Sequence, residues 1–342
     1  MNVIIETDRL AKRYGRSDAL IDLTMEVGAG EVFGFLGPNG AGKTTAVKLL
    51  LGLARPTSGR GSVLGAPLGD RQTRRRIGYL PELFRYQPWL QAREVVELHG
   101  RLRGARARAP GDGARVGSGR RDTAAAETER VLEVVGLSDR SGDVVGTFSK
   151  GMQQRLGLAV ALVGGPDLVV LDEPTSALDP VGRADVRSII RNLRDAGTTV
   201  FLNSHLLTEV ERVCDRVAIV DRGRVLASGA LDTLLGTPTV RVRVTDLPMA
   251  SRADLDGFGR PAFGDDGWLT VEGPDPEQVP DLVAAIVARG GRVHAVDQGR
   301  TTLEDRYFEL IRGTADVGRT AGVGRPDDAE RTTPDEGEER ST

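Results

Sequence analysis

The sequence predicts an α/β fold in which a largely parallel β-sheet is covered by helices on both faces. Short apolar runs alternate with helical patterns through most of the chain, and a glycine-rich loop at residues 37–45 joins one such run to a helix. The run Leu168–Asp172 is too short for a helix and apolar enough to be buried on both faces of a sheet. Sheets of this kind bind ligands at the carboxyl ends of their strands.

Length and composition limit the classes of protein that fit. The chain has 342 residues, enough for about two domains, and its net charge of −3 gives no case for wrapping nucleic acid, so no nucleic-acid partner is expected. Cys214 is the single cysteine, which excludes an internal disulfide and suits a reducing compartment. No apolar stretch reaches the roughly 18 residues that span a bilayer, and Met1–Leu10 lacks a signal-peptide core. A partner would have to hold the protein at a membrane.

The first part of the chain contains β-rich runs on either side of the glycine-rich loop and its helix. The expected elements are strands at Val3–Ile5, Ala19–Val27 and Val32–Leu36, a helix at Ala46–Leu53, and strands within 58–65 and 76–80. A helical subdomain is expected at about 84–163, with helices at Gln91–Arg103, Ala125–Val135 and Met152–Val163. Residues 104–124 are rich in Gly, Arg and Ala, with little to bury, and we expect a mobile insertion there.

The α/β pattern resumes at Leu168–Asp172 and ends near residue 236. The elements expected after this strand are a helix near Val181–Ala196, a strand at Thr198–Asn203, a helix at Leu206–Cys214, and strands near Val217–Val220 and Val225–Ser228. We therefore predict a first domain at residues 1–236.

A second, smaller α+β domain is predicted at residues 237–312. Val240, Val242 and Val244 alternate with polar residues, and the strand Trp268–Val271 and helix Val279–Ala288 follow. Thr301 and Glu304 predict a capping box for a last helix at Thr302–Arg312. Residues 313–342 are polar and charged, and we expect a disordered tail.

The loop at residues 37–45 has the sequence Gly-Pro-Asn-Gly-Ala-Gly-Lys-Thr-Thr and predicts a phosphate-binding site. Its glycines let backbone N–H groups turn around a triphosphate, and the following helix presents its positive end. Lys43 is expected to reach the β- and γ-phosphates, and Thr44 to hold Mg²⁺. A glycine-rich turn without a ligand is the alternative. The residues expected to contact the nucleotide are Gly37, Asn39, Gly40, Ala41, Gly42, Lys43, Thr44 and Thr45.

Two adjacent carboxylates follow the apolar strand Leu168–Asp172. Asp172 can bind Mg²⁺ through its hydration shell, and Glu173 can orient or deprotonate an attacking water. Hydrolysis needs both roles together. An acidic pair that merely ends a strand is the alternative, and the phosphate loop weakens that alternative.

Four ordered motifs resemble the nucleotide-binding subunit of an ATP-binding cassette (ABC) transporter. They are residues 37–45, 148–155, 171–179 and 203–205, and the resemblance covers residues 2 to about 235. It implies a P-loop NTPase core of the ABC ATPase type, with an antiparallel β subdomain and a helical subdomain. It also implies that two copies close head-to-tail around two ATP molecules.

The resemblance implies roles for residues outside the phosphate loop. Ser149 and Gly151 would contact the γ-phosphate held by the opposite copy, and the loop ending at Asp179 would connect the two sites. His205 would contact the γ-phosphate, and Tyr14 would stack on adenine. Ser149 also precedes an apolar helix, so a plain helix cap is an alternative for it. An edge-strand tyrosine and a structural histidine are the alternatives for Tyr14 and His205.

Two departures from the family pattern mark a subfamily. Glu82 stands where the family commonly has Gln, and it is expected to approach Mg²⁺ or a water near the phosphates. Lys150 and Met152 stand where Gly and Gln are usual. Such variants resemble the exporter-type cassettes that are paired with separate drug- or lipid-exporting permeases. The small C-terminal domain resembles one that follows such cassettes.

An aromatic cluster follows the predicted strand at 76–80. It consists of Tyr79, Phe84, Tyr86 and Trp89, in the segment where the family receives a cytoplasmic helix of the permease. We predict a docking groove there, and a core that links two subdomains is the alternative.

The expected function is that of a dimeric ATPase at the cytoplasmic face of the cell membrane. It would use ATP and Mg²⁺ to drive a separate transmembrane permease, an exporter of a drug-like, antibiotic or lipid substrate. The alternative is a soluble ABC-type ATPase that acts on ribosomes or DNA.

Overall fold

The computed structural model describes residues 2–103, 120–176, 178–236, 239–249, 253–264, 267–273, 276–299 and 302–320. Its centre is a ten-stranded sheet with a parallel half and an antiparallel half. The parallel half contains, in spatial order, β9 (Arg216–Asp221), β3 (Val32–Leu36), β8 (Thr199–Ser204), β7 (Leu168–Asp172) and β6 (Ile77–Leu80). The other half contains β5 (Ala66–Pro67), β4 (Ser58–Val63), β1 (Val3–Tyr14) and β2 (Ser17–Gly28), and β10 (Arg224–Ala230) joins the two halves.

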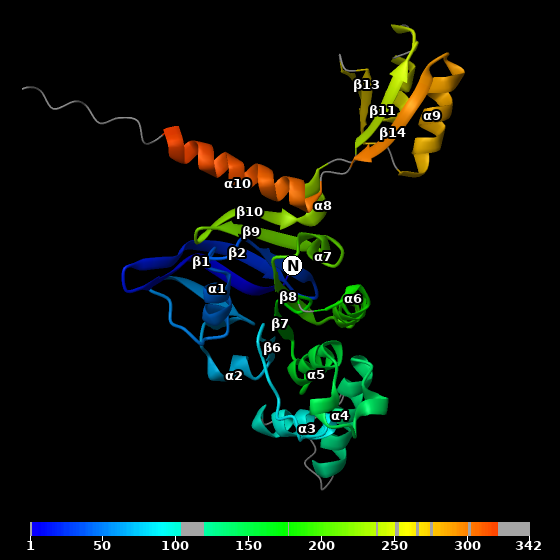
Figure 1. Cartoon of the computed structure of the whole chain (residues 1–342). Helices are drawn as coiled ribbons and strands as arrows, with labels where there is room; N and C mark the ends of the chain where they lie inside the picture. The colour runs from blue at the N-terminus through cyan, green and yellow to red at the C-terminus, as the bar shows by residue number, and fades with distance from the viewer. Residues whose placement is uncertain are drawn as a thin grey trace, which may run out of the picture.

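Helices cover both faces of the parallel half, which confirms the predicted fold class. In β3, Phe33 and Phe35 belong to the apolar cluster beneath α1 (Lys43–Leu50), whereas Val32 and Leu36 face the other side. That side is covered by α5 (Lys150–Leu162) and α6 (Pro180–Asp195) (Figure 1). Successive side chains of a strand point to opposite faces, so an entirely apolar strand is buried from both directions. A short helix, α2 (Arg71–Arg74), precedes β6.

The helical subdomain is formed by α3 (Ala92–Arg103), α4 (Arg120–Val134) and α5. The guanidinium of Arg103 ties it to the sheet by donating hydrogen bonds to the carbonyls of Ala161, Val163 and Ile77. Of the predicted insertion at 104–124, residues 104–119 lie outside the described chain, and residues 120–124 are helical. The helix therefore begins earlier than predicted, directly after the last glycine of that stretch, because the sequence there contains no further helix breaker.

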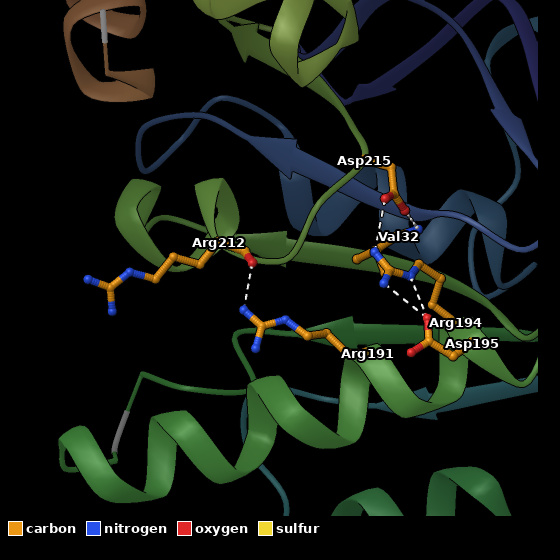
Figure 2. A network of polar contacts seen from close by, with 6 residues as sticks. All are labelled: Val32, Arg191, Arg194, Asp195, Arg212 and Asp215. Atoms are coloured by element: carbon orange, nitrogen blue, oxygen red, sulfur yellow. Dashed lines mark hydrogen bonds and ion pairs between the residues drawn. The ribbon is translucent and has the colours of Figure 1, made fainter. Parts of the chain in front are cut away.

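Helix α6 is anchored to the sheet by arginines (Figure 2). Arg194 donates to Oδ1 of Asp215 at 3.1 Å, and Oδ2 of Asp215 accepts the amide of Val32 at 2.8 Å. Arg191 donates to the carbonyl oxygen of Arg212 at 2.9 Å, just after α7 (Leu207–Glu211). A nearly buried ion pair, Arg187–Glu209, joins α6 to α7 at 2.6 Å. These contacts fix the helix after Asp179 relative to β3, the strand that leads into the phosphate loop.

The C-terminal domain is a separate four-stranded antiparallel sheet with one helix. Its elements are β11 (Thr239–Thr245), β12 (Arg260–Phe263), β13 (Trp268–Glu272), α9 (Val279–Ala288) and β14 (Arg292–Gly299). Val240, Val242 and Val244 pack with Leu282 and Ile286 of α9. The strands at 240–244 and 268–271 and the helix at 279–288 were predicted, whereas β12 and β14 were not. Both are outer strands with mixed polarity, so neither carries a regular period of two.

Helix α10 (Leu303–Thr320) connects this domain back to the first one (Figure 1). Leu303 is buried, and its amide donates to Oε2 of Glu211 at 3.0 Å, while α10 packs against α7 and α8 (Leu231–Leu235). The capping box is formed by Thr302 and Asp305, whose side chains accept each other's amides at 3.1 and 3.0 Å. Thr301 of the predicted box lies outside the described residues, and the observed box begins at Thr302, with Asp305 in the place usually taken by Glu or Gln.

Helix α10 also runs through residues 313–320, which were predicted to belong to a disordered tail. Residues 313–320 contain no proline, so the sequence does not force the helix to end at Gly313. The rest of the predicted tail, residues 321–342, lies outside the described chain. Within the described chain, the helices are too short or too polar to cross a bilayer.

Candidate active site

The predicted chemical groups leave the sheet at one edge. The parallel register pairs Leu36 with Ser204 and Asp172 with Asn203, so β3, β7 and β8 end side by side. The phosphate loop, the acidic pair and His205 follow directly after these three strand ends. The carboxyl edge of the sheet thus brings together the phosphate loop, the acidic pair and His205.

Glycine is required in the phosphate loop for steric and conformational reasons. Gly42 precedes α1 with φ of 100°, and a Cβ atom there would lie 2.4 Å from the carbonyl oxygen of Ala19. A Cβ atom at Gly37 would lie 2.3 Å from the carbonyl oxygen of Val220. The loop backbone therefore packs directly against strands β2 and β9, and α1 begins at the next residue, Lys43.

Lys43 lies among the carboxylates of the site. Its side chain is almost buried, with 8 % of the residue exposed, and Nζ donates to the carbonyls of Gly37 at 2.7 Å and Pro38 at 3.2 Å. Burial lowers the pKa of Lys43, and the charges of Glu173, Asp172 and Glu82 act in the opposite direction. Lys43 therefore lies close enough to these three carboxylates to interact with their charges.

Asp172 is buried at the end of β7, and its Oδ1 accepts a hydrogen bond from Nδ2 of Asn203 at 2.5 Å. Burial raises the pKa of Asp172, and the bond from Asn203 opposes that rise. Mg²⁺ prefers oxygen ligands, and two are available here: the carboxylate of Asp172 and the hydroxyl of Thr44, an exposed residue at the start of α1. Within the described residues, no group of three His, Cys, Asp or Glu side chains is placed to hold a metal alone. The donor set fits Mg²⁺ that is bound together with phosphate oxygens.

Glu173 has an unusual backbone conformation and a close histidine partner. Its φ is 53°, a left-handed value that costs a residue other than glycine about 1–3 kcal/mol. Its Oε1 lies 2.8 Å from Nδ1 of His205, and its amide donates to the carbonyl of Asn203 at 2.9 Å. Glu173 is 7 % exposed along its side chain, whereas the His205 side chain is 50 % exposed. A buried carboxylate is thus joined to an imidazole that reaches solvent.

Ser149 and Asp179 both begin helices. Oγ of Ser149 accepts the amide of Met152 at 3.2 Å and caps α5, while Oδ1 of Asp179 accepts the amide of Gly182 at 2.9 Å and caps α6. The capping geometry foreseen as an alternative for Ser149 is therefore present. Ser149 and Asp179 are exposed, and Gly151 is half-buried in the first turn of α5. Their contacts with a second copy stay predictions.

Tyr14 is the last residue of β1, and the contact described for its ring is with Lys12 rather than with the acidic pair. Its ring is exposed and faces Nζ of Lys12, which is 4.8 Å from the ring centroid. Stacking on adenine stays a prediction. Asn39, Gly40 and Thr44 are exposed, Thr45 is half-buried and Ala41 is buried.

Two further residues approach the acidic pair, and the sequence reasoning assigned neither a role. Asn203 bonds Asp172, and Oγ of Ser204 lies 3.4 Å from Oε2 of Glu173. The available signal was a polar pair directly after the apolar run Val200–Leu202, next to His205. The parallel register, which the sequence does not reveal, is what pairs Asn203 with Asp172.

Comparisons with known proteins agree with this geometry. Residues 20–176 match the sequence profile of the ABC transporter family. The bacitracin transport ATP-binding protein BcrA of Bacillus licheniformis is 38 % identical over 323 residues, which cover 92 % of this chain and 99 % of BcrA. The chain belongs to the ATP-binding proteins of ABC transporters. This cassette is also 35 % identical over 348 residues to the daunorubicin/doxorubicin resistance ATP-binding protein DrrA of Streptomyces peucetius, with 98 % of this chain and 96 % of DrrA covered.

Solved structures are similar to the first domain of the cassette. The ATP-binding subunit of an ABC transporter is 30 % identical, with a TM-score of 0.57, and covers 68 % of this chain and 91 % of its own. A dimeric bacterial ABC transporter cassette is 25 % identical, with a TM-score of 0.57, and covers 67 % of this chain and 99 % of its own. The family resemblance predicted from the four motifs is confirmed, and this cassette is an ATPase of the ABC transporter family.

Proposed function

We propose that this cassette hydrolyses ATP to power a separate membrane permease that exports a drug-like, antibiotic or lipid substrate. The observation that carries the proposal is the convergence of Lys43, Asp172, Glu173 and His205 at one sheet edge. BcrA and DrrA are named for bacitracin transport and for daunorubicin/doxorubicin resistance, which supports export. These names give no support to the alternative of an ATPase acting on ribosomes or DNA.

Each residue of the site has a distinct task in this proposal. The loop amides and Lys43 bind the triphosphate, and Thr44 and Asp172 would hold Mg²⁺. When bound, Mg²⁺ neutralises charge on the phosphate oxygens. Glu173 accepts the proton of the attacking water, and His205 orients Glu173 through the 2.8 Å contact. Glu173 follows the end of β7 and His205 the end of β8, so the pairing of these strands brings the two residues together.

We place a second copy of the cassette opposite this site. Ser149 and Gly151 of that copy would close on the ATP, using the exposed start of α5 and its free amides. ATP would then bridge two copies, and hydrolysis would release them, which gives the permease a two-state mechanical switch. The cassette would act at the cytoplasmic face of the membrane, held there by the permease.

The proposal is tested by expressing the cassette together with a membrane protein encoded by a neighbouring reading frame. We expect the two to co-purify from membranes, and we expect efflux of a fluorescent drug such as daunorubicin from cells to depend on Lys43. Salt-sensitive retention of the cassette on ribosomes or DNA, without co-purification with the membrane protein, would favour the alternative.

The predicted aromatic cluster divides in the structure. Phe84 and Tyr86 pack against the core with ring centroids 5.4 Å apart, and Tyr79 packs against the apolar cluster beneath α1. Trp89 is 72 % exposed, and Leu83 is also strongly exposed. The core-linking alternative thus describes the first three rings, and the docking hypothesis now rests on Trp89 and Leu83.

Replacing Trp89 by alanine is expected to lower drug efflux about tenfold, while ATP binding stays unchanged. An exposed tryptophan that anchors a partner helix contributes about 1–2 kcal/mol or more to an interface. Efflux and permease pull-down measure the effect. Trp268→Ala, in the C-terminal sheet, is the matched control because Trp268 is the other tryptophan of the chain. Unchanged permease capture by Trp89→Ala would count against docking at this site.

A further inference from the structure

Strand β8 carries a buried amide at its carboxyl end. Val200, Phe201 and Leu202 are apolar and buried, and Asn203 follows them with only 2 % of its surface exposed. In the parallel register Asn203 stands beside Asp172, the buried carboxylate that ends β7. A buried amide side chain needs partners for both its donor and its acceptor.

Only the donor of this amide has a partner among the described residues. Nδ2 of Asn203 donates to Oδ1 of Asp172 at 2.5 Å, whereas Oδ1 of Asn203 is buried without a hydrogen bond. Exchanging the amide oxygen and nitrogen would place two acceptors, Oδ1 and the carboxylate oxygen, against each other. The orientation with the donor toward Asp172 is therefore the favourable one, and the amide oxygen is the atom that lacks a partner.

The position of this oxygen indicates which donor it would accept. It belongs to a side chain that stands beside Asp172, the carboxylate assigned to the metal, at the carboxyl end of β8 where the triphosphate is expected. A water bound to Mg²⁺ uses its lone pair on the metal and presents its hydrogens outward, so it donates strongly to a nearby acceptor. Residues behind the direct ligands commonly orient those ligands and tune metal affinity.

We propose that Asn203 is a positioning residue of the metal site, which fixes Asp172 through Nδ2 and accepts a hydrogen bond from a Mg²⁺-bound water through Oδ1. The inference rests on the proposed ATPase function and assigns its metal site a further residue. The backbone carbonyl of Asn203 separately accepts the amide of Glu173 at 2.9 Å. Changing the Asn203 side chain therefore leaves the backbone support of Glu173 in place.

The test uses the full chain with Asn203→Leu, which keeps the branching of the side chain and removes both polar groups. Affinity for a fluorescent, non-hydrolysable ATP analogue is measured with and without Mg²⁺, and Mn²⁺ binding to the protein–nucleotide complex is measured by electron paramagnetic resonance. We expect metal affinity to fall about tenfold and metal-free nucleotide affinity to stay within about twofold of wild type. Asn192→Leu, at an exposed position on α6, is the matched control.

Asn203→Val is a second variant, because a β-branched residue suits a buried central strand and should fold. Unchanged Mn²⁺ affinity in either folded variant would overturn the proposal. So would an equal loss of nucleotide affinity with and without metal, because that result indicates a merely structural role. Failure of the wild-type chain to bind the nucleotide analogue would instead refute the ATPase function, so the two failures are distinguishable.

Discussion

Replacing Glu173 by glutamine is expected to lower steady-state ATP hydrolysis by at least about 100-fold while ATP still binds. The amide keeps the shape of the carboxylate and its place beside His205, 2.8 Å away in the native chain, but it cannot accept a proton from water. The residue that remains beside His205 therefore has the same contacts but no basic oxygen. Phosphate release from the purified cassette, with and without its permease, measures the loss.

The same substitution should trap two copies around ATP. A dimer that closes on ATP and opens after hydrolysis remains closed when hydrolysis is blocked, so Glu173→Gln should elute as a dimer in MgATP and as a monomer without it. Glu129→Gln, at an exposed position on α4, is the matched control and should behave as wild type. Wild-type turnover by Glu173→Gln would remove the assigned base. A persistent monomer in ATP, even beside the permease, would contradict the shared site.

The fold of the cassette could be predicted because its signals are local. Strands β3 and β7 are largely apolar runs of five residues, and a glycine-rich loop follows β3 while an acidic pair stands where the chain leaves β7. These runs predict strands, and their alternation with helices predicts parallel pairing. The predicted strand Val32–Leu36 and the predicted helix Val279–Ala288 have the observed bounds.

The parts that could not be predicted depend on contacts between distant segments. β14 is a mixed-polarity strand whose pairing with β11 defines it. The role of Asn203 likewise follows from a register between β7 and β8, segments about 30 residues apart. Sequence motifs identified Asp172 and Glu173, but only the sheet brings an amide to one and a histidine to the other.

Replacing Lys43 by alanine is expected to weaken ATP binding about 100-fold, which separates it from Glu173→Gln. Charge-assisted hydrogen bonds to phosphate contribute about 1.5–3 kcal/mol, and the almost buried position of Lys43 limits screening by water. In the native chain its ammonium lies beside the loop carbonyls of Gly37 and Pro38, at the mouth of the predicted triphosphate site. Titration with a fluorescent ATP analogue measures the loss directly.

Lys48 provides the matched control, because it lies on the same helix and is exposed to solvent. Lys48→Ala removes the same charge from α1 but not from the phosphate loop, so its ATP affinity should stay within about twofold of wild type, as expected for an exposed charge. Equal losses in the two variants would mean that the overall charge of the helix, rather than a placed ammonium, holds the triphosphate. A loss confined to Lys43→Ala would instead assign binding to the loop, and a loss of turnover without loss of binding in Glu173→Gln would assign the chemistry to the end of β7.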